Sequence, residues 1–438
     1  MHLIPTPRFI GLLACGAPLW LAAVWLPGGV GVAIIYLTAL LYVSLREAWS
    51  LPPAQMLQVS RELPQRFSLD TEQEIGLSIT NHSAAFLRLR VRDEIPQALG
   101  SSAPLLAGTL HAAQRVRWTY RVRPQRRGQH TYGNVVLRLE HEFGLLQRQI
   151  RLPVHDTVKI YPRFADMHDY ALLAKIDQRD DVVKRPRRVR GHGTEFESLR
   201  PYESGEDLRL VDWKASARQG ALISRNLRIE RGQQLAILID AGRLMREPLG
   251  KFPRFEYALN AAVMLSYVAQ KRGDSVAVAA FSNRIESFLP PTRGPSIIPR
   301  VLESLYPVEP RALEADYWRV MADVMGRLKR RSLVIMLTDV LDAAGSTGLM
   351  ANLLRAAAKH LVLCVVLHNR HIMDRADAMP TDLDTTYSKA AASQVELQRH
   401  LALQHMRSRG IQVLESDPDH FSVHLVQRYL DIRQRDLL

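Results

Sequence analysis

The feature that most constrains this chain is an uncharged, apolar stretch near its start. No charged residue occurs between Phe9 and Leu45. The stretch is interrupted at residues 26–31, "LPGGVG", where a proline and glycines favour a turn. Each arm holds about 16–18 residues, which as a helix would span roughly 25 Å, close to the thickness of a bilayer core. We therefore expect a transmembrane helical hairpin within residues 1–50, anchored by residues 9–45.

The charges flanking this stretch predict its orientation. Arg8 precedes it and Arg46 follows it, and basic residues beside a membrane span favour the cytoplasmic side. The chain after residue 46 would then face the cytoplasm. A cleaved signal peptide, or a lipoprotein site ending at Cys15, fits less well because the apolar run continues. Cys15 and Cys364 are the two cysteines, which excludes a disulfide framework and favours a reducing compartment.

Residues 51–162 change to short runs that alternate apolar and polar side chains. Examples are "EIGLSITNHS", "FLRLRVRDEI" and "QRVRWTYRVRP", separated by turn-forming residues. Several such runs over about 100 residues predict a β-sandwich. The segment has no metal-ligand spacing or nucleophile pair, so we expect it to act as a spacer or docking module.

Residues 231–438 alternate between continuous apolar runs and amphipathic ones. "QLAILIDAG", "DSVAVAAFS", "SLVIMLTDV" and "LVLCVVLHN" read as buried strands, with helices between them. This alternation predicts an α/β domain with a doubly wound, mostly parallel sheet. Ligands of such sheets bind at the carboxyl ends of the strands, and Asp240 and Asp339 follow their strands directly.

Residues 163–230 bridge the two predicted domains and are unusually rich in charge. The run Lys184–Arg190 could attract anionic lipid or nucleic acid, although no RNA-binding motif or zinc spacing accompanies it. A denser segment, "GTEFESLRPYESGEDLRLVDWKASARQG", follows at residues 193–220. Its arginines could pair with its acids, and its tyrosine and tryptophan could anchor it. We expect either an inter-domain clasp or a docking surface, with candidate residues Glu195, Arg200, Tyr202, Asp207, Arg209, Asp212, Trp213, Lys214 and Arg218.

This segment and the following "LAILIDAGRLM" resemble the bacterial Domain of Unknown Function 58 family. The resemblance implies a membrane protein of the bacterial inner (cytoplasmic) membrane with a von Willebrand A-like α/β domain. Such proteins are typically encoded beside MoxR-type AAA+ ATPases. The resemblance therefore implies an adaptor or scaffold that works with such an ATPase in assembling or remodelling protein complexes. Residues 141–144, "HEFG", stand where the family often has Asp-Pro-Phe-Gly.

A von Willebrand A domain, by the same resemblance, holds a metal through Asp-x-Ser-x-Ser, a threonine and a later aspartate. Asp240 and Asp339 match the two acids, whereas Gly242 and Leu244 replace the serines. Ser296 is the best substitute for the threonine. Because glycine and leucine supply no side-chain oxygen, Mg²⁺ at these positions would be a degenerate site. The alternative is that both acids cap helices or accept loop amides.

The sequence favours binding over catalysis. It contains no Gly-x-Ser-x-Gly elbow, Walker-type phosphate loop, His-Glu-x-x-His or dinucleotide glycine motif. The main hypothesis is therefore a non-enzymatic adaptor that requires no cofactor and binds no nucleic acid. Two alternatives stay open: a metal-dependent hydrolase that uses Asp240 and Asp339, and an anionic lipid or nucleic-acid binder that uses Lys184–Arg190.

Overall fold

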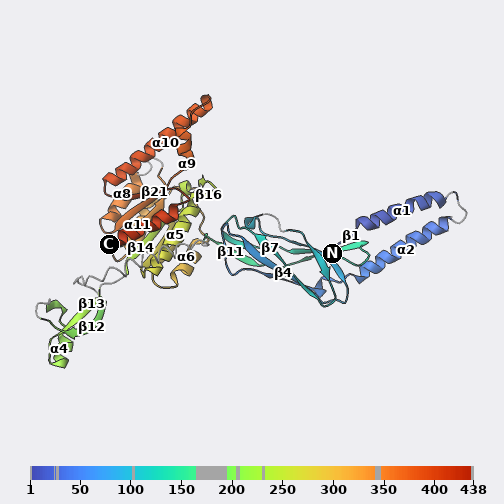
Figure 1. Cartoon of the computed structure of the whole chain (residues 1–438), viewed down its shortest axis with the longest axis horizontal. Helices are drawn as coiled ribbons and strands as arrows, with labels where there is room; N and C mark the ends of the chain where they lie inside the picture. The colour runs from blue at the N-terminus through green and yellow to red at the C-terminus, as the bar shows by residue number, and fades with distance from the viewer. Residues whose placement is uncertain are drawn as a thin grey trace. The chain divides into compact units, whose positions relative to one another are not determined.

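The chain divides into two compact units, Met1–Arg163 and Phe164–Leu438, here called the N-terminal and C-terminal units (Figure 1). Each unit has apolar clusters of its own. The computed structural model describes most of the chain, namely residues 2–23, 25, 29–100, 104–163, 195–203, 208–228, 232–340 and 347–435.

Two apolar helices begin the N-terminal unit, α1 (Pro7–Ala23) and α2 (Gly29–Ser50). They lie side by side (Figure 1), and the Tyr36 hydroxyl donates a hydrogen bond to the Leu12 carbonyl (2.6 Å). α2 is long and apolar enough to cross a membrane, whereas Pro7–Leu21 is a shorter apolar helix. An N-terminal helix suited to a membrane span is thus confirmed, and a span by both arms stays a prediction.

The rest of the N-terminal unit consists of short strands in three sheets. Most of the predicted alternating runs form strands, and Pro153 lies between the last two strands of the unit, at residues 146–152 and 157–161. The first sheet has the order β1 (His2–Pro5), β10 (Leu146–Leu152), β9 (Val135–Glu140), β5 (Leu87–Asp93) and β6 (Leu106–Leu110). The second sheet has the order β2 (Leu57–Glu62), β4 (Gln73–Asn81) and β7 (Arg115–Val122). The third has the order β3 (Phe67–Ser68), β11 (Thr157–Tyr161) and β8 (Gly128–Thr131).

One turn of the N-terminal unit, at residues 144–145, binds both the start of α1 and the end of α2. The Thr6 hydroxyl, just before α1, donates to the Gly144 carbonyl (2.6 Å). The buried Glu47 carboxylate, near the end of α2, accepts from the N–H groups of Gly144 (2.7 Å) and Leu145 (2.9 Å). Arg148 donates to main-chain carbonyls at the end of α2. These hydrogen bonds fix the open end of the helical pair to the sheet.

The C-terminal unit contains a six-stranded mixed sheet. Its order is β18 (Ile285–Thr292), β17 (Ser275–Phe281), β14 (Gln234–Asp240), β19 (Leu333–Thr338), β20 (Leu361–Leu367) and β21 (Gln412–Ser416). All neighbours pair in parallel except β18, which is antiparallel to β17. The sequence did not predict β18, because Pro290 and Pro291 lie within it. An edge strand tolerates proline, because the backbone on its outer side makes no hydrogen bonds to a neighbouring strand.

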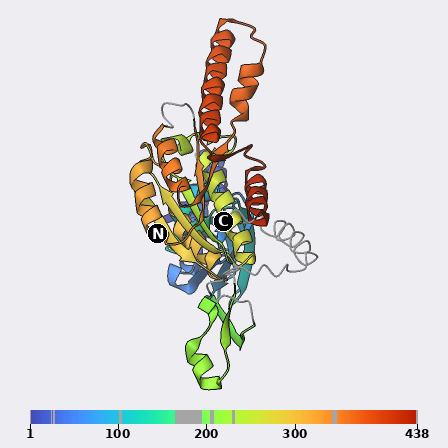
Figure 2. The same ribbon diagram turned by 90° about the vertical axis from the view of Figure 1, so that its left-hand side faces the viewer.

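Helices pack on both faces of this sheet (Figure 2). α5 contacts both α6 and α11, and α7 contacts α8. α10 packs against its neighbour α9 along part of its length. The helices are α5 (Arg254–Lys271), α6 (Ile297–Leu305), α7 (Tyr317–Arg327), α8 (Thr347–Ala357), α9 (Arg370–Asp377), α10 (Leu383–Ser408) and α11 (Phe421–Gln434).

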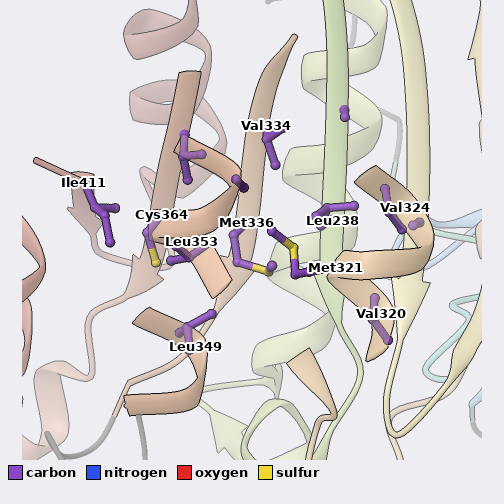
Figure 3. Packing of buried hydrophobic residues seen from close by; sticks show 14 of the residues in the cluster. Leu238, Val320, Met321, Val324, Val334, Met336, Leu349, Leu353, Cys364 and Ile411 are labelled. Carbon is purple, nitrogen blue, oxygen red and sulfur yellow. The ribbon is translucent and has the colours of Figure 1, made fainter. Parts of the chain in front are cut away.

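One apolar cluster of this unit lies between the sheet and the helices α7, α8 and α10. Figure 3 shows Leu238 and Met336 of the strands beside Met321 of α7 and Leu353 of α8. Cys364 of β20 belongs to the same cluster, and burial raises the pKa of its thiol to about 12. The thiol is therefore protonated at neutral pH and packs as a small apolar group.

Candidate functional site

The charge-rich segment folds as a β-hairpin that carries a short helix, here called the signature hairpin (residues 195–228). β12 (Glu195–Pro201) pairs antiparallel with β13 (Ile223–Arg228). Between them lie a 3₁₀ turn, η3 (Leu208–Leu210), and α4 (Trp213–Gln219). The sequence predicted the short helix but neither strand, because the charged residues of both strands obscure an alternating pattern.

Asp212 and Ser216 organise the signature hairpin internally. The Asp212 carboxylate caps α4 by accepting hydrogen bonds from the N–H groups of Lys214 (3.1 Å) and Ala215 (3.0 Å). The Ser216 hydroxyl donates to the Asp212 carbonyl (2.8 Å) and accepts from the Ile223 N–H (2.9 Å). These bonds tie α4 to the start of β13, so Asp212 acts as a structural residue of the hairpin.

Two described ion pairs support the hairpin weakly. Arg200 lies 3.8 Å from Glu203, and Arg225 lies 3.6 Å from Asp212. The first pair was among those predicted; Arg225 was not a candidate. All four side chains are partly exposed, and such pairs typically contribute about 0–1 kcal/mol.

Several of the predicted residues cannot be placed by side-chain contacts. Asp207 and the basic run Lys184–Arg190 lie outside the described residues, and so do the side chains of Glu195 and Arg209. Tyr202 is half-buried, and its N–H donates to the Leu222 carbonyl (2.9 Å). The choice between an inter-domain clasp and a docking surface therefore stays a prediction.

The signature hairpin exposes large apolar side chains. Trp213, the first residue of α4, is 66% exposed, and Leu208 is 61% exposed, while Val211 and Ile223 are buried. Lys214 and Arg218 are exposed on the same helix, and their spacing of four places them on one face. An exposed tryptophan beside basic residues is typical of a protein-binding surface.

A second group of polar residues lies at the carboxyl ends of the adjacent strands β14 and β19, where the chain changes direction across the sheet. Ligands of doubly wound sheets bind at such a position. The group, here called the carboxyl-edge cluster, consists of Asp240, Arg254, Tyr317, Thr338, Asp339 and Arg399.

Asp240 is 2% exposed and both of its carboxylate oxygens accept hydrogen bonds. Oδ2 accepts from the hydroxyls of Thr338 (2.6 Å) and Tyr317 (2.7 Å), and Oδ1 accepts from the Gly242 N–H (2.7 Å). Burial raises the pKa of Asp240, and the three hydrogen bonds oppose that rise.

Asp339 is buried between two arginines. Its Oδ2 lies 3.0 Å from Arg254 of α5, and its Oδ1 lies 2.9 Å from Arg399 of α10. Oδ1 also accepts from the Val340 N–H (2.9 Å), and Arg399 donates to the Leu367 carbonyl (2.6 Å). Both arginines are almost fully buried. Neither arginine was among the residues predicted from the sequence.

Residues 198–406 match the family model described as a protein of unknown function, DUF58. These residues belong to the DUF58 family. The DUF58 segment contains most of the signature hairpin and all of the carboxyl-edge cluster, and the resemblance noted in the sequence is confirmed.

One curated relative of this chain is the uncharacterized protein YeaD of Bacillus subtilis (strain 168). It is 23% identical over 214 residues, which are 47% of this chain and 52% of YeaD. The chain thus spans about half the length of that relative.

Two solved structures resemble part of the chain. The CARDB domain of PF1109 from Pyrococcus furiosus has 13% identity and a TM-score of 0.17 over 24% of this chain and 94% of the domain. The ASH/PapD-like domain of human CEP192 has 12% identity and a TM-score of 0.19 over 25% of this chain and 88% of the domain. Such low scores do not bear on the fold of this chain.

The carboxyl-edge cluster does not fit a magnesium ion. A Cβ added at Gly242 would lie 2.9 Å from Asp240 Oδ1 and 3.1 Å from the Leu313 carbonyl oxygen, so the loop has no space for a serine ligand. Among the described residues, Ser296 is exposed at the start of α6 and makes no capping hydrogen bond. Guanidinium groups already balance Asp339. Nor do the described residues include any cluster of three or more His, Cys, Asp or Glu that could hold a metal.

The cluster instead joins elements of the C-terminal unit that are distant in sequence. Asp240 connects β14 to α7 and β19 through Tyr317 and Thr338. Asp339 connects β19 to α5 and α10 through Arg254 and Arg399. Its side chains hold one another, which is the arrangement of a structural centre.

Proposed function

We propose that this DUF58 chain is a membrane-anchored, non-enzymatic adaptor that binds a protein partner through the signature hairpin. The observation that carries the proposal is the exposed apolar surface around Trp213 and Leu208. Asp212 and Ser216 hold the underlying turn in place, so the surface is pre-organised, which lowers the entropic cost of binding.

The anchor is the α1–α2 pair. α2 has the length and apolarity for a span, and one turn at residues 144–145 binds both ends of the pair. A pair held in this way has its open end on one side of the membrane. Arg8 and Arg46 beside that end favour the cytoplasmic face of a bacterial inner membrane.

The C-terminal unit, in this proposal, is a von Willebrand A-like domain that has replaced metal binding with an internal ion cluster. The sheet order, with its single antiparallel edge strand β18, supports this assignment. So do the two aspartates after β14 and β19. Arg254 and Arg399 supply the positive charge that a metal would otherwise bring to Asp339.

The partner proposed from the family resemblance is a MoxR-type AAA+ ATPase, with which the chain would assemble or remodel protein complexes. The experiment is co-purification of the full-length chain, in mild detergent, with an ATPase of this type encoded beside it, with and without ATP. Recovery of the complex in either state supports the proposal. Recovery of the chain alone in both states would contradict the partner.

A further inference from the structure

A cavity of ≈ 400 Å³ opens at the edge of the sheet opposite the carboxyl-edge cluster. It lies where α7 and α8 end, just before β19 and β20 begin. Its apolar lining includes Met321, Met325, Leu328 and Ala356. Met321 is also part of the core beside Met336 and Leu353 (Figure 3), so the floor of the cavity is anchored in the core. The volume is within the range of small-molecule sites.

The rest of the cavity lining is strongly basic. None of the lining residues in the described part of the chain is acidic. Arg355 and Lys359 are exposed, at the end of α8 and just after it. The basic residues that line the cavity are Lys329, Arg330, Arg331, Arg355, Lys359 and His360.

His360 is a buried polar group with unused hydrogen-bonding capacity. It is 7% exposed, it lines the cavity, and its Nδ1 has no hydrogen-bond partner within the described residues. Burial and the charge of Lys359 lower its pKa, so the imidazole is neutral at neutral pH. Buried ring nitrogens normally have a partner, and a bound ligand would supply one.

Helix dipoles explain only part of this arrangement. The carboxyl ends of α7 and α8 favour nearby cations, which accounts for Arg355 and Lys359 individually. The dipoles do not account for a cavity between the two helix ends, for its methionine floor, or for the unpartnered nitrogen of His360.

We propose that this cavity binds a nucleotide-like ligand, which combines a planar apolar ring with two or more phosphates. Arginine forks and lysines bind phosphate oxygens through charge-assisted hydrogen bonds. Lys329, Arg355 and Lys359 are exposed cations of the lining, and three cations call for a ligand with more than one negative charge. The flexible thioethers of Met321 and Met325 adapt to a flat ring. This site is independent of partner binding at the signature hairpin.

The test is calorimetric titration of the full-length chain in mild detergent and magnesium-free buffer. The probes are ATP, adenosine and tripolyphosphate. ATP is expected to bind at least about tenfold more tightly than either fragment, because only ATP uses both the apolar floor and the basic rim. Equal affinity for ATP and tripolyphosphate would overturn the proposal, as would the absence of ATP binding.

Two sets of variants test whether ATP binds in this cavity. Arg355→Ala combined with Lys359→Ala is expected to weaken ATP binding at least about tenfold, and both side chains are exposed, so the fold is preserved. Arg246→Ala removes an exposed cation from η4 (Arg243–Arg246), near the opposite edge of the sheet, and is expected to leave affinity unchanged. An equal loss in Arg246→Ala would overturn the proposal. Displacement of ATP by a polyglutamate peptide at equal concentration would also overturn it, in favour of an acidic protein segment.

Discussion

The signature hairpin and the carboxyl-edge cluster are both rich in acids and arginines, but their charged groups have different surroundings. In the cluster, Asp240 and Asp339 are buried, and hydrogen bonds and arginines from distant elements engage them. In the hairpin, Asp212 caps a local helix and leaves Trp213 exposed. The cluster resembles an active site in composition, yet its groups hold one another. The signature hairpin instead exposes an aromatic side chain, and it is the region for which we propose a protein partner.

The largest effect is expected from breaking the cluster with Asp339→Ala. The variant leaves Arg254 and Arg399 buried without their counterion, which typically costs about 3–5 kcal/mol. Hydrogen exchange of the β19 amides in the full-length chain measures the loss as faster opening. The control is Glu314→Ala, which removes an exposed ion pair with Arg243 (2.8 Å) and is expected to cost less than about 1 kcal/mol. Similar effects of the two variants would contradict a structural role for the cluster.

A smaller effect is expected from the protonation of Asp240. Because its pKa is raised in the folded state, the folded chain binds this proton more tightly than the unfolded chain does. Its contribution to stability is therefore greatest at low pH and declines as the pH rises through the folded pKa. The stability difference between the native chain and Asp240→Asn should shift in favour of the native chain between pH 7 and pH 4, as measured by denaturant unfolding at each pH. A constant difference over this range would refute the burial effect.

A third prediction concerns the Asp212 cap, which should stabilise α4 within the signature hairpin. Asp212→Ala removes the acceptor for two N–H groups of the first turn, and such a change costs about 1 kcal/mol. Exchange of the α4 amides should accelerate about fivefold, while the β19 amides stay unchanged. Equal acceleration in both regions would show that the hairpin does not fold as a local unit.

The sequence was sufficient for those features that have a local pattern. Alternating and continuous apolar runs predicted most strands, and the uncharged stretch predicted the apolar helix α2. Residues 193–220 led to the family. The antiparallel strand β18 was not predicted, because it contains Pro290 and Pro291 and proline is rare in strands.

The partners of Asp339 had no local pattern, because Arg254 and Arg399 come from helices far away in sequence. One signal was present. Arg399 shares a helical stripe with Ala402, Leu403 and Met406, all buried, and a charge on an apolar stripe indicates a buried ion pair.

The central claim is that the signature hairpin is the docking surface, and Trp213→Ala tests it most directly. Tyr387→Ala is the matched control, because Tyr387 on α10 is an aromatic side chain of similar exposure, 73% against 66%. Affinity for the MoxR-type ATPase is measured with each full-length variant in mild detergent. Loss of a central aromatic anchor typically costs about 2 kcal/mol or more, so Trp213→Ala should weaken binding at least about thirtyfold and Tyr387→Ala should not. Unchanged affinity in Trp213→Ala, or an equal loss in Tyr387→Ala, would contradict the account.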